Sequence, residues 1–432
     1  MIRARIRPGK PLRGRVRVAS DLQIGQQALV WAALAHGTST IEGLDARHAS
    51  LSAALSAMGV RIGSQIQGVG LRGLRIPTGA LDAKDSEPAL ILLTSLLAGQ
   101  TFGTRITGPD SSLRTLIAPL RARGAHLAGK ASETDIRPPV SVAPLLADEL
   151  LESVEIDIPT GDASTKLGLL VSGLYARGVT AIREGMLSRD HAERALVALG
   201  LPLSTAAGMT LLDTSESEPR WAGFQWQLPG DFTIAAHLLA AAMIVPGSDL
   251  TVESVGLNPT RTHWLSALGG TGARVKATPK GDCAGNEPLG DVRAASSKIT
   301  RVRVGGERAF GLLDEVPALA ALAVVAADRI SIRDVTSLRA RTPDAINALR
   351  DTLALFGVSC TTYEDGLEVD PPSALRGALI DGAPEQALLG CILGLVAEGE
   401  TVIEGVERLD ARYPGVLSAL QTLGADVTRE EA

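Results

Sequence analysis

Charged side chains stand near the starts of several apolar segments, where they could bind or react with a small molecule. Lys166 lies in the first turn of an apolar segment that opens at Asp162. A positive charge at this place opposes the helix dipole, so we expect Lys166 to face a solvent cleft or an anion. Asp314 opens another apolar segment, and it could act as a base or only as a helix N-cap. Arg339 and Arg341 form either a solvated pair or part of a cleft.

Three glutamines, Gln23, Gln26 and Gln27, lie close together at the start of another apolar segment. Their amides could hydrogen-bond a neutral or weakly charged ligand, or they could hold two domains together. His191 and His237 are expected to be ordinary structural histidines. The three cysteines lack metal-ligand spacing and cannot form a disulfide framework, so we predict a reduced cytoplasm, no metal and no cofactor.

The composition excludes several classes of function. The 432 residues carry a net charge of −6 and only 3% aromatic residues, without a basic tract, which argues against nucleic-acid binding. No apolar run is long enough to span a bilayer, and the first residues do not form a signal peptide. We expect a monomeric cytoplasmic protein with a small polar or anionic metabolite as its ligand.

The chain consists of six related units, which is its clearest element-level pattern. Each unit has an apolar segment, a glycine-led turn, a strand and a second helix. Because a helix that is apolar on all sides must be enclosed, we place these segments inside two domains, three in each. The six segments are 21–35, 85–98, 162–176, 231–245, 314–327 and 381–397, each opening at or just after an Asp, with Ser86 and Ser164 as second options for the cap.

The segments between these helices carry strand and turn signals. Strands are expected at 39–43, 180–184, 250–255, 330–334 and 401–405. Amphipathic outer helices are expected at 49–58, 192–199, 343–356 and 414–423. A glycine follows each outer helix at the position of a left-handed C-terminal cap, namely Gly59, Gly200, Gly357 and Gly424.

Several longer motifs resemble the enolpyruvyl transferase family, and within it the 5-enolpyruvylshikimate-3-phosphate (EPSP) synthases. The resemblance is strongest over Pro229–Asp231 and over Ile244–Thr262, which includes Leu257-Asn258-Pro259-Thr260-Arg261. Ser188–Arg194 and Leu313–Leu319 are similar to two further family segments. A fainter similarity at Leu409–Tyr413 is to the related enzyme that acts on UDP-N-acetylglucosamine.

The resemblance implies an α/β fold with two inside-out domains, each made of three βαβαββ units around three buried helices. It places the first domain at 19–229 and the second at 1–18 plus 230–432, so that the first strand pairs within the second domain. It implies transfer of an enolpyruvyl group from phosphoenolpyruvate to shikimate-3-phosphate, a transferase step of aromatic amino acid biosynthesis, with both substrates bound between the domains.

The chain departs from the family at many of its cationic positions. The family's Lys and Arg at the first helix are Leu22 and Gln27, and a Ser there is Gln23. The catalytic Glu is Thr342, and a nearby Arg is Ala345. Other family positions also differ. A glycine is replaced by Glu87, an Arg by Ile91 and a Lys by Ala411, and Arg412 partly replaces that Lys.

The resemblance leaves a partial site on the shikimate side. Asp314 matches the carboxylate that serves as a base, and Arg341 matches a substrate-binding Lys. The substrate-binding residues predicted in this way are Gln23, Gln27, Ser164, Thr165, Lys166, Ser188 and Arg341. Two functions stay open. One is a transferase, for the family substrates or a less anionic one. The other is a catalytically silent paralogue with a ligand-binding, scaffolding or regulatory role.

Overall fold

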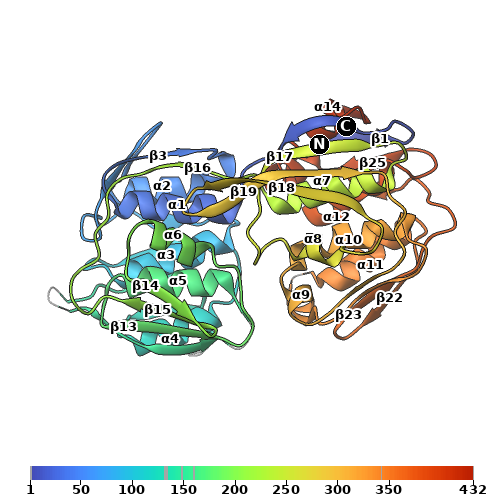
Figure 1. Cartoon of the computed structure of the whole chain (residues 1–432). Coiled ribbons are helices and arrows are strands. Elements are labelled where there is room, and N and C mark those ends of the chain that lie inside the picture. Colours follow the sequence, from blue (N-terminus) through green and yellow to red (C-terminus); the bar gives the residue numbers. More distant parts are fainter. Residues whose placement is uncertain (1, 131–134, 147–148, 159–160, 342, 432) are drawn as a thin grey trace. The chain divides into compact units, whose positions relative to one another are not determined.

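The structure is a computed structural model that describes residues 2–130, 135–146, 149–158, 161–341 and 343–431. The chain divides into two compact units (Figure 1). Unit 1 comprises Met1–Ser20, Pro229–Gly281 and Pro288–Ala432, and unit 2 comprises Asp21–Leu228 and Asp282–Glu287. These boundaries lie within two residues of the predicted 18/19 and 229/230 junctions. The assignment of 282–287 to unit 2 has no counterpart in the sequence analysis.

Three apolar helices form the interior of unit 2. They are α1 (Leu22–Leu34), α3 (Glu87–Ala98) and α5 (Ala163–Gly173), and most of their side chains are buried, as a helix that is apolar on all sides requires. The other helices of this unit are η1 (Ala46–His48), α2 (Ala49–Ala57), α4 (Arg114–Ala122) and α6 (His191–Ala198).

Three four-stranded sheets surround these helices, and in each the first strand of the order given is parallel to the second while the other pairings are antiparallel. The sheet orders are β16 (Gln225–Gln227), β3 (His36–Glu42), β5 (Ile66–Val69), β4 (Arg61–Ile62); β6 (Leu81–Asp82), β7 (Thr104–Thr107), β9 (Arg137–Val142), β8 (Leu127–Lys130); and β11 (Glu155–Ile158), β13 (Val179–Glu184), β15 (Met209–Asp213), β14 (Leu203–Ala206). A short parallel pair joins β10 (Leu151–Glu152) to β12 (Ala176–Arg177).

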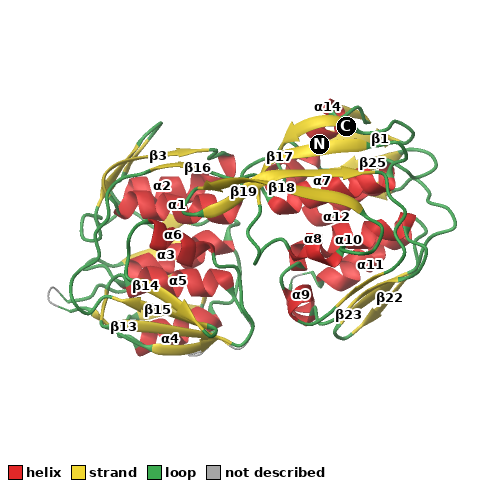
Figure 2. Ribbon diagram, in the orientation of Figure 1, coloured by secondary structure: helices red, strands yellow, loops and turns green. Residues whose placement is uncertain are grey.

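Unit 1 repeats this design with its own core. Its interior helices are α7 (Phe232–Ile244), α10 (Val316–Ala321) with its continuation η3 (Leu322–Val325), and α12 (Pro384–Gly394). Its other helices are α8 (His263–Ala267), α9 (Glu307–Phe310), η2 (Leu313–Glu315), η4 (Thr336–Ala340), α11 (Ala345–Leu355), α13 (Val406–Arg412) and α14 (Val416–Thr422). Figure 2 shows helices inside and strands outside in each unit.

The three sheets of unit 1 follow the same plan. Their orders are β24 (Leu379–Ile380), β25 (Thr401–Glu404), β1 (Ile2–Arg7), β26 (Asp426–Glu431); β2 (Arg13–Arg17), β17 (Asp249–Gly256), β19 (Glu287–Ala295), β18 (Arg274–Cys283); and β20 (Val302–Val304), β21 (Ile330–Ile332), β23 (Gly366–Val369), β22 (Cys360–Tyr363). Strand β1 pairs antiparallel with β25 and β26, which confirms that the first strand belongs with the C-terminal half.

The inside-out α/β fold expected from the sequence is therefore present, although three of the predicted Asp caps are wrong. Asp21, Asp162 and Asp231 cap α1, α5 and α7 through their side chains. Helix α3 is capped by Ser86, the second option predicted there, instead of Asp85. Asp314 lies inside η2. Asp381 pairs with Arg408, and the N-cap residue of α12 is Ala383, two positions further along the chain.

Candidate functional site

A cavity of about 360 Å³ opens within unit 1, among η2, α10, α11 and α12. Its volume lies in the range of small-molecule sites, about 300–1,000 Å³. Apolar side chains form much of the wall, including Leu338 after β21, Leu349 on α11 and Leu389 on α12. These leucines lie in η4, α11 and α12. Because the other faces of these helices pack in the core, the apolar wall of the cavity is held in place.

Two acidic and two basic side chains line the same cavity: Asp314, Glu385, Arg341 and Arg412. A nitrogen of Arg341 donates to Oδ1 of Asp314 at 2.8 Å. Nε of Arg412 lies 3.7 Å from Oε1 of Glu385, an oxygen that also accepts a 3.2 Å hydrogen bond from the Tyr413 hydroxyl. The side chains of both arginines and of Glu385 are nearly half exposed, so this part of the cavity is open to solvent.

Local backbone structure places each of these groups. Asp314 lies in the single turn η2 before α10, and Arg341 leaves η4 in an extended conformation. Glu385 follows Pro384, which starts α12 in the position where a missing N–H is tolerated. Arg412 ends α13, and its guanidinium lies over the ring of Tyr413, 5.4 Å from the centroid.

The charges act on one another across the cavity. Burial lowers the pKa of Arg341, but Asp314, followed by Glu385, outweighs this effect and raises the pKa above its ordinary value. Burial raises the pKa of the Tyr413 phenol well above its ordinary value, although the Arg412 guanidinium acts against this. Tyr413 is therefore a neutral hydrogen-bond donor, and both arginines are charged at neutral pH.

The structure thus brings Asp314 and Arg341 together in one cavity. Asp314 accepts from Arg341 and does not cap a helix, so the N-cap interpretation is wrong. Arg339 points elsewhere, because it pairs with Asp344 and donates to the backbone carbonyls of Tyr363 and Glu364. Thr342, at the position of the family's catalytic Glu, lies outside the described residues.

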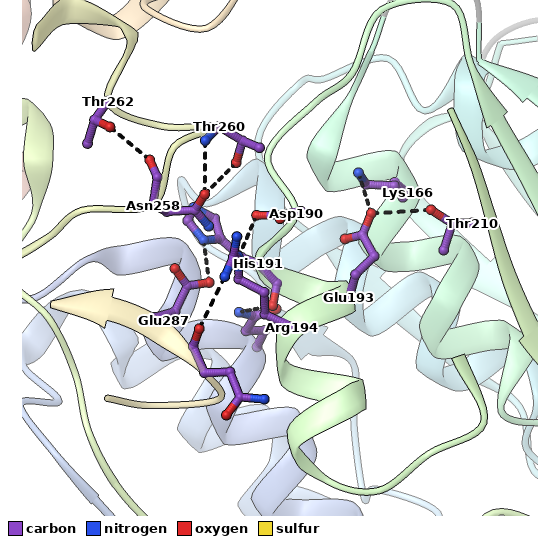
Figure 3. Close-up of polar contacts among 12 residues, drawn as sticks. Lys166, Asp190, His191, Glu193, Arg194, Thr210, Asn258, Thr260, Thr262 and Glu287 are labelled. Atoms are coloured by element: carbon purple, nitrogen blue, oxygen red, sulfur yellow. Dashed lines mark hydrogen bonds and ion pairs between the residues drawn. The ribbon is translucent and has the colours of Figure 1, made fainter. Parts of the chain in front are cut away.

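Lys166 is buried in unit 2 and does not face a solvent cleft; of the two expected surroundings it has the anionic one, supplied by carboxylates of the protein itself. Its Nζ lies 2.8 Å from Glu184 and 2.6 Å from Glu193, and all three side chains are less than a tenth exposed. Figure 3 shows the contact between Lys166 and Glu193. Burial lowers the pKa of Lys166, but the two carboxylates outweigh burial and raise it. The Lys166 charge is thus balanced by the protein itself.

The other predicted residues of unit 2 lie on α1, on α5 and beside α6. Ser164 and Thr165 donate their backbone N–H groups to Asp162, and the Thr165 hydroxyl also donates to that carboxylate at 2.6 Å. The backbone N–H of Ser188 donates to Glu184 at 3.3 Å, so Ser188 and Lys166 share one partner.

Two of the predicted glutamines behave differently. Gln27 is buried and donates to the backbone carbonyl of His191 at 3.3 Å. Gln23, one turn earlier on α1, is only partly buried. The site prediction did not include Glu385 and Tyr413. Glu385 could be found only from its place in the first turn of a buried helix, where a carboxylate complements the helix dipole.

Two broader features also bear on function. The described residues contain no group of three or more His, Cys, Asp or Glu side chains arranged to hold a metal ion. Within those same residues, we find no helix with the length and hydropathy needed to cross a membrane.

Comparison with known proteins places the chain in a family. The family model for EPSP synthase (3-phosphoshikimate 1-carboxyvinyltransferase) matches residues 6–420. A 3-phosphoshikimate 1-carboxyvinyltransferase of Citrifermentans bemidjiense is 35% identical, covering 96% of this chain and 98% of that protein. One of Synechococcus sp. is 36% identical, covering 96% and 95%.

A solved structure agrees with these relatives. The EPSP synthase of Acinetobacter baumannii superimposes with a TM-score of 0.87 at 27% identity, and the match covers the whole of both chains. The fold, the arrangement of buried helices and the sequence similarity over almost the entire length agree, and the chain belongs to the EPSP synthase family.

Proposed function

We propose that this chain binds a small polar metabolite in the unit 1 cavity. We further propose that it transfers enolpyruvyl from phosphoenolpyruvate to shikimate-3-phosphate far more slowly than the relatives that are named for this reaction. Asp314 and Arg341 act in binding, and Lys166 has a structural role.

One observation carries this proposal, namely the charge at the starts of the six buried helices. Both family substrates carry several negative charges, and they need basic side chains in addition to helix dipoles. In the first turns of α1, α3, α5, α7, α10 and α12 the basic residue is Lys166, which already lies between two carboxylates. Two of these turns contain an acid instead, Glu87 in α3 and Glu385 in α12.

The binding free energy lost with the missing cations shows how far the affinity for the family substrates should fall. A hydrogen bond to a charged group contributes about 1.5–3 kcal/mol. Losing the cations expected at positions 22, 27 and 345, now Leu22, Gln27 and Ala345, therefore removes roughly 5–9 kcal/mol if the effects add. At about 1.4 kcal/mol per factor of ten, the affinity for such substrates falls by several orders of magnitude.

A second function is favoured by the names of the relatives. Those at 35–36% identity are called 3-phosphoshikimate 1-carboxyvinyltransferases, which supports the transferase reaction in the shikimate pathway. The pair formed by Asp314 and Arg341 at matching positions also supports it. In that case Asp314 would take a proton, and Arg341 would hold a negatively charged substrate group.

The test measures the reaction directly. Purified protein is mixed with shikimate-3-phosphate and phosphoenolpyruvate, and phosphate release is followed together with formation of the enolpyruvyl product. The Citrifermentans bemidjiense relative is the positive control. We expect a rate at least a thousandfold below that control, and no rescue of growth in cells that lack their own EPSP synthase. A rate within tenfold of the control would overturn the proposal and establish the transferase.

A further inference from the structure

The side chains that line the unit 1 cavity carry equal numbers of positive and negative charges, while Asp231, which does not line it, adds negative charge nearby. The two guanidiniums of the cavity, Arg341 and Arg412, face two carboxylates, Asp314 and Glu385. Each arginine interacts with both carboxylates: Arg341 with Asp314 first and Glu385 second, and Arg412 with both of them in addition to Asp231. A ligand with several negative charges therefore gains contact with the arginines only by approaching the carboxylates, which repel it.

The remainder of the cavity is apolar, and its polar groups are already satisfied. Leu338, Leu349 and Leu389 line it. Gln386 also lines it, but its Nε2 donates to the Thr352 hydroxyl at 3.2 Å, and its Oε1 accepts from the Ala383 N–H at 2.9 Å. The Thr352 hydroxyl in turn donates to the Ala348 carbonyl at 2.8 Å. A ligand group that enters this part needs to be apolar.

We propose that the cavity binds an α-amino acid with a large apolar side chain, as a zwitterion. The ligand carboxylate pairs with Arg341 and Arg412, whose forked guanidiniums suit a carboxylate. The ligand ammonium lies between Asp314 and Glu385, and the side chain enters the space lined by the leucines. This inference rests on the proposed function and specifies its ligand class.

The balance of charges selects this class of ligand over simpler ones. A zwitterion leaves the net charge of the cavity unchanged, because it adds one positive and one negative group. It also gives each of the four charged side chains an opposite charge to contact. A monoanion or a monocation satisfies only one pair, and a small amino acid such as alanine leaves the apolar part empty.

The first experiment is isothermal titration of the full chain at pH 7.5 with L-phenylalanine and L-leucine. Four comparison ligands each lack one feature: 3-phenylpropionate lacks the ammonium, phenethylamine lacks the carboxylate, L-alanine lacks the large side chain, and phosphoenolpyruvate carries excess negative charge. We expect saturable binding of at least one of the two amino acids, at least tenfold tighter than any comparison ligand.

Variants connect that binding to the cavity. Asp314→Asn and Arg341→Gln should each weaken amino-acid binding at least tenfold. Arg329→Gln is the matched control, because Arg329 is a half-exposed arginine paired with Asp370 and Glu368 and does not line the cavity. It should bind as the unchanged protein does. Thermal melting of each variant establishes that it is folded before binding is compared.

The outcomes separate this inference from the proposed function. Equal binding of 3-phenylpropionate and L-phenylalanine, or binding that survives both cavity substitutions in folded protein, overturns the zwitterion assignment. Absence of binding by both L-phenylalanine and L-leucine overturns the assignment, and the ligand-binding function stands if any comparison ligand binds in their place. Rapid enolpyruvyl transfer overturns the function itself, whatever the amino acids do.

Discussion

Lys166 illustrates how a single side chain can change its role within a fold. The ammonium lies on the apolar helix α5, in the first turn, where the helix dipole disfavours a positive charge. Glu184 from β13 and Glu193 from α6 reach it from two other elements of unit 2. The Thr210 hydroxyl donates to Glu193 at 3.4 Å and so extends the cluster to β15 (Figure 3). The cluster therefore joins one buried helix to the sheet and the outer helix of its repeat.

Replacing this lysine should destabilise unit 2 strongly. Lys166→Met leaves two buried carboxylates without their cation, which costs about 3–5 kcal/mol in free energy of unfolding. Urea denaturation at pH 7.5 measures the change. The control is Lys10→Met, because Lys10 forms a solvent-exposed pair with Asp426, and such pairs contribute about 0–1 kcal/mol. Equal effects of the two substitutions would contradict a structural role for Lys166.

His237 makes the stability of unit 1 depend on pH. Burial lowers the pKa of His237 to about 4, although its Nδ1 lies 2.8 Å from the carbonyl oxygen of Thr233. Between pH 6.5 and 4 the unfolded chain binds a proton on this residue and the native chain does not. Stability from this group is therefore complete above pH 6.5 and falls as the solution becomes more acidic, by about 3 kcal/mol in total.

The measurement compares two variants across this range of pH. Denaturation midpoints from pH 7.5 to 4.5 should fall less steeply in His237→Gln than in the unchanged protein. Other groups titrate in both proteins, so the difference in slope isolates His237. Parallel curves for His237→Gln and the unchanged protein would refute the assignment.

At the scale of elements, helix starts depend on the choice of cap. Ser86 Oγ accepts the backbone N–H of Ala89 at 3.2 Å and also the side-chain amide of Gln26 at 2.9 Å. Because the hydroxyl serves both its own helix and α1, we expect Ser86→Ala to lower the free energy of unfolding by about 1–2 kcal/mol. Asp85→Ala, one residue earlier on the surface, should change it by less than about 0.5 kcal/mol. If the two substitutions exchanged these effects in urea denaturation, Asp85 would be the cap.

The sequence predicts most elements of this fold because their signals are local. Apolar length places the six buried segments, and Gly59, Gly200, Gly357 and Gly424 end outer helices with positive φ angles as expected. Local signals do not distinguish neighbouring cap candidates, as the choice between Asp85 and Ser86 shows. They also miss the early end of α10 at Ala321, where the chain continues as the 3-10 helix η3 through Val324 and Val325.

The candidate site is harder to predict than the fold, because its contacts are distant in sequence. Asp314 and Arg341 are 27 positions apart, and motif matching found both. The sequence does not show that Lys166 is buried, because its neutralising partners, Glu184 and Glu193, come from other elements whose approach is not encoded locally. Glu385 was missed for the same reason, since its contact with Tyr413 joins two helices.

At the scale of the whole molecule, the chain passes between its two units at four points, and the last two bracket a short insertion. Residues Asp282–Glu287 form the tip between β18 and β19 and belong to unit 2, while most of both strands belongs to unit 1. Within unit 2, Glu287 accepts from Nδ1 of buried His191 at 2.7 Å, and the backbone carbonyl of Asn286 accepts from Arg194 (Figure 3). Helix α6 therefore holds the tip through polar contacts.

Removing the carboxylate should loosen the tip without unfolding the hairpin. A hydrogen bond to a charged group contributes about 1.5–3 kcal/mol, so Glu287→Ala should speed amide hydrogen exchange at 282–287 by roughly tenfold or more. Residues 274–280 of β18 provide the internal control, since their strand neighbours lie in unit 1 and do not include His191. Uniform acceleration across 274–295 would instead mean that the pair stabilises the entire hairpin. Unchanged exchange at the tip would mean that Arg194 and the backbone contacts hold it, and that the His191–Glu287 pair is dispensable for joining this segment to unit 2.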